Sequence, residues 1–255
     1  MPAKTNAFKA RLLAGETVIG CWLATGEAYV AEMMGTAGFD WLVVDGEHAP
    51  NDIRSIRAQL TALAASPSAP VVRLPVGEAW MIKQALDAGA ETLLIPMVES
   101  AEQAAALVRA CRYPPAGMRG VGGALGRATD FNLASDYIGT ANDQICLLVQ
   151  VESRAGLAAL DGILATEGVD GVFIGPSDLS TDMGFAGDTE APEVQAAIAD
   201  AVRRIAAAGK APGILAVTEA PTQRYIDLGV RFVAVGADVF LLTAAARALA
   251  AKWKG

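Results

Sequence analysis

The chain has 255 residues, of which 53% are hydrophobic and 6% aromatic, and its 20 basic and 28 acidic residues give a formal charge of −8. This length allows one large domain or two smaller ones. The basic residues are scattered, which excludes the electrostatic footprint of a protein that binds nucleic acid or an anionic membrane. The amino terminus lacks the apolar core of a secretory signal, and no uncharged apolar stretch reaches membrane-spanning length. We therefore expect a soluble, cytoplasmic protein.

Short apolar runs alternate with alanine-rich helical stretches along the chain, after a first predicted helix over residues 6–14. The predicted strands cover residues 18–24, 41–44, 70–73, 92–96, 146–151, 171–174, 212–216 and 232–235. The predicted helices between and after them begin near Ala28, Asn51, Ala79, Ser100, Ala155, Pro192, Thr218 and Asp238. Several of these helices carry start and stop signals, such as Pro192 in a first turn and Gly229 just after a last one.

Eight strand-helix units in a chain of this length predict a (β/α)8 TIM barrel, with residues 1–255 forming a single domain and the first helix as an addition. An open, doubly wound sheet is the alternative. That fold would favour a glycine-rich turn after the first strand, and the segment from Cys21 lacks the Gly-x-Gly-x-x-Gly pattern. The one long interruption, residues 112–140, precedes the fifth strand and would lie at the bottom of a barrel. We interpret it as a structural loop, because a functional role would require it to reach a neighbouring subunit.

Ionisable and polar side chains gather at the carboxyl ends of several predicted strands, which is the face where barrel enzymes assemble their sites. These residues are Asp45, Glu47, His48, Arg73, Gln150, Glu152 and Asp178. Glu152 and Asp178 are the strongest candidates for metal ligands, because two neighbouring carboxylates repel each other unless a cation lies between them. Two oxygen donors suit Mg²⁺, Mn²⁺ or Co²⁺ with positions left for substrate and water. The alternative is that both acids are helix caps or loop ion-pair partners.

Arg73 and His48 are the candidates for binding an anion and moving a proton. Arg73 ends an apolar strand, where an unpaired positive charge would be costly. It could therefore bind the carboxylate of a substrate or stabilise an oxyanion, or it could pair with a carboxylate of the core. His48 is the only histidine. It could carry a proton if Asp45 or another carboxylate holds its ring, or it could be an ordinary surface residue.

The sequence lacks the residues that several common catalytic mechanisms require. No lysine falls within a predicted strand or at its carboxyl end, so a Schiff-base mechanism lacks its amine. No phosphate-binding Gly-x-x-x-x-Gly-Lys loop, dinucleotide fingerprint or Gly-x-Ser-x-Gly elbow occurs, and we expect no nucleotide cofactor. The three cysteines are widely separated, which fits reduced thiols in the core.

Six segments in order resemble the class II, metal-dependent pyruvate aldolases of the 4-hydroxy-2-oxoheptanedioate aldolase / 2-dehydro-3-deoxyglucarate aldolase family. They are Val-Asp-Gly-Glu-His-Ala-Pro-Asn from residue 44, Lys-Gln-Ala-Leu-Asp-Ala-Gly-Ala from 83, Ile-Pro-Met-Val from 95, Arg-Tyr-Pro-Pro-Ala-Gly-Met-Arg-Gly from 112, Gln-Val-Glu-Ser from 150 and Ile-Gly-Pro-Ser-Asp-Leu from 174. The resemblance implies a (β/α)8 barrel, commonly a hexamer whose terminal helices are exchanged. It also implies a divalent metal and reversible aldol cleavage that yields pyruvate, or a related 2-oxoacid, and an aldehyde.

The resemblance also implies roles for individual residues. Glu152 and Asp178 match metal ligands, Arg73 the pyruvate-side arginine, and His48 a proton carrier with which Asp45 and Asp87 are associated. The substrate-binding positions are matched by Gln150, Gly175, Ser177, Trp22, Val121 and Leu215. Asp87 lies in a helix away from its own top face, so any role of Asp87 would be across a subunit contact, and Val121 would likewise serve a neighbour.

Two departures from the family pattern bear on the substrate. Ser177 stands where alanine is common, and Thr129-Asp130-Phe131 replaces a usual basic-aromatic pair. They leave the preferred donor and acceptor open. Oxaloacetate decarboxylation, cleavage of 2-keto-3-deoxy sugar acids, and a non-catalytic barrel that binds a small acid remain as alternatives.

Overall fold

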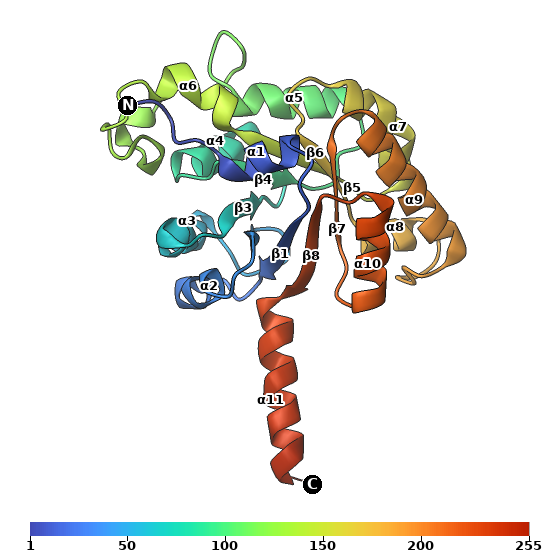
Figure 1. The fold of residues 1–255 in the computed structure, drawn as a ribbon. Coiled ribbons are helices and arrows are strands. Elements are labelled where there is room, and N and C mark those ends of the chain that lie inside the picture. Colours follow the sequence, from blue (N-terminus) through green and yellow to red (C-terminus); the bar gives the residue numbers. More distant parts are fainter. Residues whose placement is uncertain (255) are drawn as a thin grey trace.

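Eight parallel strands close into a barrel in the computed structural model, which describes residues 1–254 (Figure 1). Each strand pairs with the next, and β8 pairs with β1. The strands are β1 (Val18–Leu23), β2 (Trp41–Asp45), β3 (Ala69–Arg73), β4 (Thr92–Ile95), β5 (Cys146–Val151), β6 (Gly171–Ile174), β7 (Ala211–Leu215) and β8 (Phe232–Ala237). The predicted (β/α)8 barrel is confirmed.

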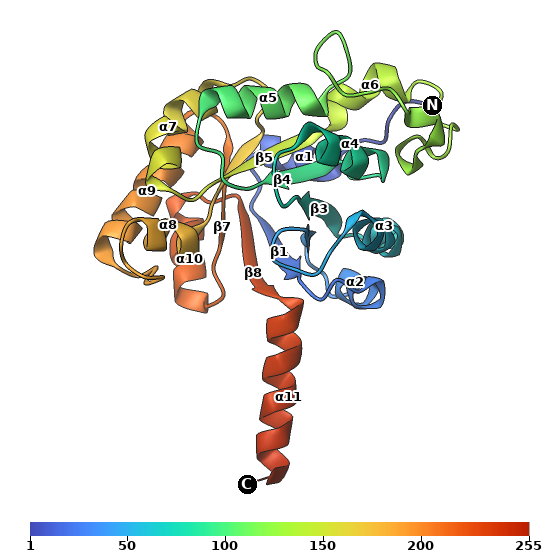
Figure 2. The same ribbon diagram turned by 180° about the vertical axis from the view of Figure 1, so that it is seen from behind.

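Helices surround this barrel in both views of the ribbon (Figures 1 and 2). They are α1 (Ala7–Leu13), α2 (Ala28–Gly35), α3 (Ile53–Ala62), α4 (Ala79–Asp87), α5 (Ala101–Cys111), α6 (Tyr137–Gln144), α7 (Arg154–Ala165), α8 (Pro176–Asp182), α9 (Pro192–Ala207), α10 (Glu219–Leu228) and α11 (Asp238–Lys254). Three 3-10 helices complete the described part of the chain: η1 (Leu63–Ala65), η2 (Gly123–Leu125) and η3 (Arg127–Thr129).

Aromatic side chains fill the barrel interior and close its amino-terminal end. Trp41 and Phe232 lie with ring centroids 5.9 Å apart, and Phe8 of α1 packs on Trp41 at the same distance. A Cβ at Gly20 would overlap the Trp41 ring, and one at Gly213 would overlap Phe232. Glycine on the neighbouring strand therefore makes room for each large ring. A second apolar cluster packs the outer strand faces against the helices, which is the two-sided burial expected of parallel strands.

The observed strands begin and end within two residues of the predicted limits. The segment 112–140 is more structured than the predicted loop, since it contains η2 and η3 and the start of α6. The polar sequence of α6 gave no apolar periodicity. The short α8 after β6 was also not predicted, and it places Asp178 in a first helical turn instead of a loop.

Helix α11 projects from the carboxyl end of the barrel and away from the other elements (Figure 1). Its exposed side chains include Phe240, Leu241, Leu242, Leu249 and Trp253. Asp238 fixes the start of the helix, because its carboxylate accepts hydrogen bonds from the backbone N–H of Ala24 at 2.8 Å and of Val239 at 2.7 Å. Within residues 1–254, no helix has the length and apolar character needed to cross a bilayer.

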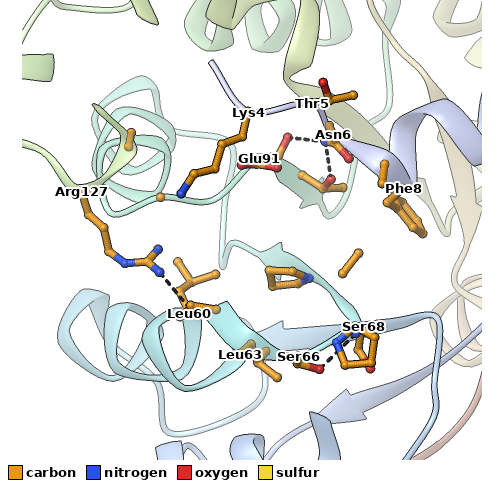
Figure 3. Close-up of a pocket in the computed structure, with 18 of the residues that line it drawn as sticks. Lys4, Thr5, Asn6, Phe8, Leu60, Leu63, Ser66, Ser68, Glu91 and Arg127 are labelled. Atoms are coloured by element: carbon orange, nitrogen blue, oxygen red, sulfur yellow. Dashed lines mark hydrogen bonds between the residues drawn. The ribbon is translucent and has the colours of Figure 1, made fainter. Parts of the chain in front are cut away.

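A cavity of about 260 Å³ opens at the amino-terminal end of the barrel, on the face opposite the strand carboxyl ends. Lys4 and Arg127 extend toward it (Figure 3). Lys4 pairs with Asp130 at 3.1 Å, and Arg127 donates to the backbone oxygen of Leu60 at 3.3 Å. Glu91 also lines the cavity, and burial raises the pKa of its carboxyl although Lys4 and Arg127 partly oppose this effect.

The raised pKa of Glu91 makes its charge a cost to folding at neutral pH. The folded chain binds this proton more tightly than the unfolded chain, so stability falls as pH rises from the unfolded pKa of about 4.3 through the folded value. We expect Glu91→Gln to be more stable than the natural chain at pH 7.5, with a difference that shrinks as the pH is lowered toward 4. Urea unfolding of both chains across this range measures the effect; a difference that does not vary with pH would contradict it.

Candidate active site at the carboxyl ends of the strands

A buried ion pair joins the ends of β2 and β3. Asp45 and Arg73 are register partners on these adjacent strands. The Nε and Nη2 atoms of Arg73 donate to the two oxygens of Asp45 at 2.9 and 2.7 Å. The side chains are 9% and 3% exposed, which makes this a desolvated two-point pair of the strong kind. Both sequence interpretations of Arg73 therefore stay open, because pairing with a core carboxylate does not consume all five N–H groups of a guanidinium.

Asp45 also shapes the loop that follows it. Its Oδ1 accepts hydrogen bonds from the backbone N–H groups of Glu47 at 2.9 Å and His48 at 3.3 Å. Gly46 lies so close to β3 that a Cβ would stand 2.7 Å from the backbone oxygen of Arg73. Asn51 secures the other side of the loop by donating to the backbone oxygen of Asp45 at 2.7 Å. The loop conformation is therefore fixed by the same carboxylate that holds Arg73.

Glu47 connects the arginine to the histidine. Its Oε2 lies 2.7 Å from Arg73 Nη1 and 3.8 Å from His48 Nε2. Desolvation raises the pKa of Glu47, and the charge of Arg73 partly opposes this. The imidazole is 68% exposed, and Asp45 reaches His48 only through the backbone. The sequence predicts Glu47 at this face but not its contact with Arg73; the one signal is its place between Asp45 and His48.

Glu152 lies at the same end of the barrel, directly after β5, two strands from β3, and is 3% exposed. One carboxylate oxygen accepts from the backbone N–H of Met97 at 2.9 Å, and the other accepts a short hydrogen bond from the amide of Gln150. Burial is the main cause that raises the pKa of Glu152; the nearby charge of Asp178 raises it further, while these hydrogen bonds and Arg73 lower it. The carboxylate is therefore held in place by hydrogen bonds, but no cation forms a salt bridge with it in the described residues.

The contribution of Met97 could not be found from sequence. Its φ of +54° lies in the left-handed region, which is unusual for a residue with a side chain. This conformation accompanies the donation of its N–H to Glu152. Every residue but proline carries a backbone N–H, so the sequence offers no signal for which one points into a site.

Oxygen donors at this edge suit a hard cation. The buried Oε1 of Gln150 has no hydrogen-bond partner in the described chain, and Asp178, in the first turn of α8, is close enough for its charge to act on Glu152. In residues 1–254, no cluster of three or more His, Cys, Asp and Glu side chains has the geometry to hold a metal. A site of two carboxylates would leave the coordination sphere open to small molecules, as is usual for Mg²⁺.

The floor of the mouth is apolar. The ring centroids of Trp22 and Phe173 lie 5.5 Å apart. The guanidinium carbon of Arg73 lies 5.3 Å from the centroid of the Trp22 ring. Leu215, at the end of β7, packs against the same inner cluster. Gly175 precedes α8, and the exposed Ser177 lies in its first turn. These four positions, which sequence analysis assigned to substrate binding, all lie at or near strand carboxyl ends.

Asp87 and Val121 do not join this group within one chain. Asp87 ends α4, at the opposite end of the barrel, where its Oδ1 accepts from Arg119 Nη2 at 2.6 Å. Val121 follows in the loop after α5 and is 63% exposed. Any contact of these two residues with the mouth of a barrel therefore involves a second copy.

Comparison with known proteins identifies relatives that span the whole barrel. The profile of the HpcH/HpaI aldolase/citrate lyase family matches residues 18–245. A hydroxypyruvate/pyruvate aldolase of Roseovarius nubinhibens is 61% identical over 254 residues, covering 100% of this chain and 99% of that protein. A 4-hydroxy-2-oxo-heptane-1,7-dioate aldolase of Salmonella dublin is 56% identical over 248 residues, or 97% of this chain and 94% of that protein.

A solved structure agrees with these sequences. The crystal structure of a family protein from Burkholderia cenocepacia superposes with a TM-score of 0.95 at 43% identity, covering 98% of this chain and 100% of that one. The backbone that carries the candidate site is therefore shared with a solved member of the same family.

Gly175 tests whether Glu152 and Gln150 form a cation site. A Cβ at this position would overlap the Glu152 carboxylate and stand 3.2 Å from the Gln150 amide nitrogen. We expect Gly175→Ala to weaken Mn²⁺ binding by about 10- to 100-fold, as disturbed support of metal ligands generally does. Isothermal titration calorimetry measures this, with Gly162→Ala on the outer helix α7 as the control. Unchanged affinity in Gly175→Ala would remove the pair from the cation site.

Proposed function

Because this chain belongs to the HpcH/HpaI aldolase/citrate lyase family, we propose that its barrel mouth performs a divalent-metal-dependent aldol reaction of pyruvate or hydroxypyruvate with an aldehyde. The protein is a carbon–carbon lyase, an aldolase of the class II pyruvate type. In the cleavage direction, a 4-hydroxy-2-oxoacid yields the 2-oxoacid and the aldehyde.

One observation carries this proposal: a cation with free donors and a buried carboxylate without a paired cation lie at the same end of the barrel, close enough for their charges to interact. Asp45 uses two of the five N–H groups of Arg73, and Glu47 lies against a third nitrogen. Glu152, after β5, has a raised pKa because it is buried. A 2-oxoacid carries a negatively charged carboxylate next to a keto oxygen that becomes negative during the reaction. Two positively charged groups, one on each side of the substrate, would stabilise these oxygens. Arg73 supplies one of them.

The other positive partner is a divalent cation, and the donor set fits it. Glu152 and Asp178 would hold the ion, with the unpaired Oε1 of Gln150 close by. When bound, Mg²⁺, Mn²⁺ or Co²⁺ would supply Lewis acidity that makes the methyl protons of the 2-oxoacid more acidic. The raised pKa of Glu152 supports this assignment, because a positive charge at the carboxylate removes the cost of its ionisation.

Arg73 and His48 divide the remaining work. Arg73 donates hydrogen bonds to the oxygen on which negative charge develops as the methyl group loses a proton to a solvent water and its carbon becomes nucleophilic; in cleavage the same carbon takes a proton back from water. His48 exchanges a proton with the aldehyde oxygen: it removes the proton from the 4-hydroxyl group in cleavage and returns it in addition. Its exposed ring suits the outer substrate. Asp45 holds Arg73 and the loop of His48 in one arrangement.

Substrate choice depends on the surroundings of this centre. Trp22 and Leu215 offer an apolar surface, and Ser177 adds a hydroxyl where alanine is common in the family. A hydroxyl near the methyl group of the 2-oxoacid suits hydroxypyruvate, and the relative from Roseovarius is named for both hydroxypyruvate and pyruvate. A panel of aldehydes offered with each 2-oxoacid determines the preferred pair, and assays with oxaloacetate and 2-keto-3-deoxy acids separate the related reactions that share the enolate.

We also propose that the protein works as a homo-oligomer, with the hexamer of the family as the expected form. Helix α11 supports this, since it projects from the barrel with large apolar side chains in solvent. Asp87 and Val121 would then approach the mouth of a neighbouring barrel.

Removal of the metal tests the central claim. We expect chelation with EDTA to abolish aldol turnover and added Mn²⁺ or Mg²⁺ to restore it. Glu152→Gln should lack turnover at metal concentrations that saturate the natural chain, because the amide removes the negative ligand. Product formation from pyruvate and an aldehyde is the measurement. Full turnover by metal-free protein would refute the mechanism.

Variants of Arg73 and His48 test the division of roles. Exchange of pyruvate methyl protons with D₂O requires the enolate but no aldehyde. We expect Arg73→Ala to abolish both exchange and aldol turnover. We expect His48→Ala to retain exchange while aldol turnover falls by roughly 10²- to 10⁴-fold, the usual contribution of a positioned acid or base. NMR follows both reactions; an equal loss of the two in His48→Ala would contradict the assignment.

A further inference from the structure

Two opposite charges line the cavity at the amino-terminal end of the barrel without pairing with each other. Within residues 1–254, the carboxylate of Glu91 forms no salt bridge and accepts no hydrogen bond. The guanidinium of Arg127 makes one hydrogen bond there, to the backbone oxygen of Leu60 at 3.3 Å, and has no salt-bridge partner. The charge of Arg127 nevertheless acts on Glu91. The two groups therefore lie near each other with a gap between them.

The backbone around each charge is fixed. Glu91 directly precedes β4, and its backbone oxygen accepts hydrogen bonds from Asn6 Nδ2 at 3.1 Å and from the N–H of Cys146 at 2.8 Å. Arg127 begins η3, and its guanidinium packs over Gly89, where a Cβ would stand 2.5 Å from Nη1. Gly89 has a φ of +102°, which also favours glycine at this position. The two charges come from different elements and border the same space (Figure 3).

The rest of the cavity wall offers few other polar partners. The hydroxyl groups of Ser66 and Ser68 already donate to backbone oxygens, at 2.7 and 2.6 Å. Phe8, Leu63 and Pro70 supply apolar surface (Figure 3). A small molecule in this cavity would therefore meet two unpaired charges and an apolar wall.

A molecule that matches both charges carries an anionic and a cationic group. A simple anion beside Arg127 would be repelled by Glu91, and a simple cation beside Glu91 would be repelled by Arg127 and Lys4. An α-amino acid carries both groups on one carbon. Its carboxylate suits the two-point geometry of a guanidinium, and its ammonium suits a carboxylate. The ammonium would also oppose the burial that raises the pKa of Glu91.

We propose that this cavity is a second binding site, which takes an aliphatic α-amino acid. The α-carboxylate accepts hydrogen bonds from Arg127, which has five N–H groups and uses one. The ammonium donates to Glu91, and the aliphatic side chain packs toward Phe8 and Leu63. The site is separate from the barrel mouth, because it lies at the opposite end of the strands. It does not depend on the proposed aldol reaction.

Three probes of similar size test this chemistry. They are L-leucine, 4-methylpentanoate, which lacks the ammonium group, and 3-methylbutylamine, which lacks the carboxylate. We expect the natural chain to bind L-leucine at least about 10-fold more tightly than either analogue, because a hydrogen bond to a charged group contributes about that much. Isothermal titration calorimetry at pH 7.5 measures the three affinities. Absence of L-leucine binding, or equal affinities for all three probes, would overturn the proposal.

Variants of the two charged residues identify which group of L-leucine each one binds. We expect Arg127→Met to bind L-leucine about 10- to 100-fold more weakly and to lose its preference over 3-methylbutylamine. Glu91→Gln should show a similar loss and no longer prefer L-leucine to 4-methylpentanoate. Each variant should keep its preference against the other analogue. A loss of affinity that leaves both preferences unchanged would contradict the assigned contacts.

An exposed ion pair provides matched controls. Arg224 and Glu190 pair at 2.9 Å on the surface, and Arg224→Met and Glu190→Gln should bind L-leucine as the natural chain does. If Arg127→Met fails to fold, Lys4→Met replaces it, since the Lys4 side chain is 68% exposed and its ammonium also borders the cavity; the preference over 3-methylbutylamine should then fall by a smaller factor.

A competition experiment separates this site from the barrel mouth. Saturating pyruvate with Mn²⁺ should leave the affinity for L-leucine unchanged, because the two sites lie at opposite ends of the strands. Displacement of L-leucine by pyruvate would place it at the mouth and overturn the proposal.

Discussion

The pairing of Asp45 with Arg73 is the interaction on which the rest of the site depends. Parallel register places the two residues side by side at the carboxyl ends of β2 and β3, so the barrel itself positions a buried cation. The same carboxylate binds the backbone N–H groups of Glu47 and His48. A single acid therefore links the guanidinium of Arg73 to the backbone of the loop that carries His48, and the loop cannot shift without disturbing that hydrogen-bonded pair.

The acids of the mouth differ in character because their surroundings differ. Asp45 is buried but fully matched by Arg73, whereas Glu152 is buried with amide donors that do not neutralise its charge. Asp178 is exposed in the first turn of α8, where a helix amino terminus favours a negative side chain. Asp45 is thus matched by a cation within the chain, whereas Glu152 and Asp178 have no cation paired with them in the described residues.

The features of the site that follow from the geometry of parallel strands could be predicted from the sequence. Strands end at a common edge, so Arg73, Gln150 and Glu152 could be placed together from the apolar runs that precede them. The sequence could not decide whether Arg73 binds a substrate or a core carboxylate, because a guanidinium has enough donors to do both. The sequence also carries no signal for Met97, whose contribution is a backbone N–H, or for α6, an eight-residue helix that buries only Tyr137 and Ala141 and so shows too short an apolar pattern to be recognised.

Phe8, Trp41 and Phe232 seal the barrel from below. These rings fill that end of the barrel in the described residues, so the candidate site is approached from the carboxyl ends of the strands. If the 2-oxoacid lies against Trp22 and the aldehyde lies nearer the rim, we expect ordered kinetics in which the 2-oxoacid binds first and leaves last.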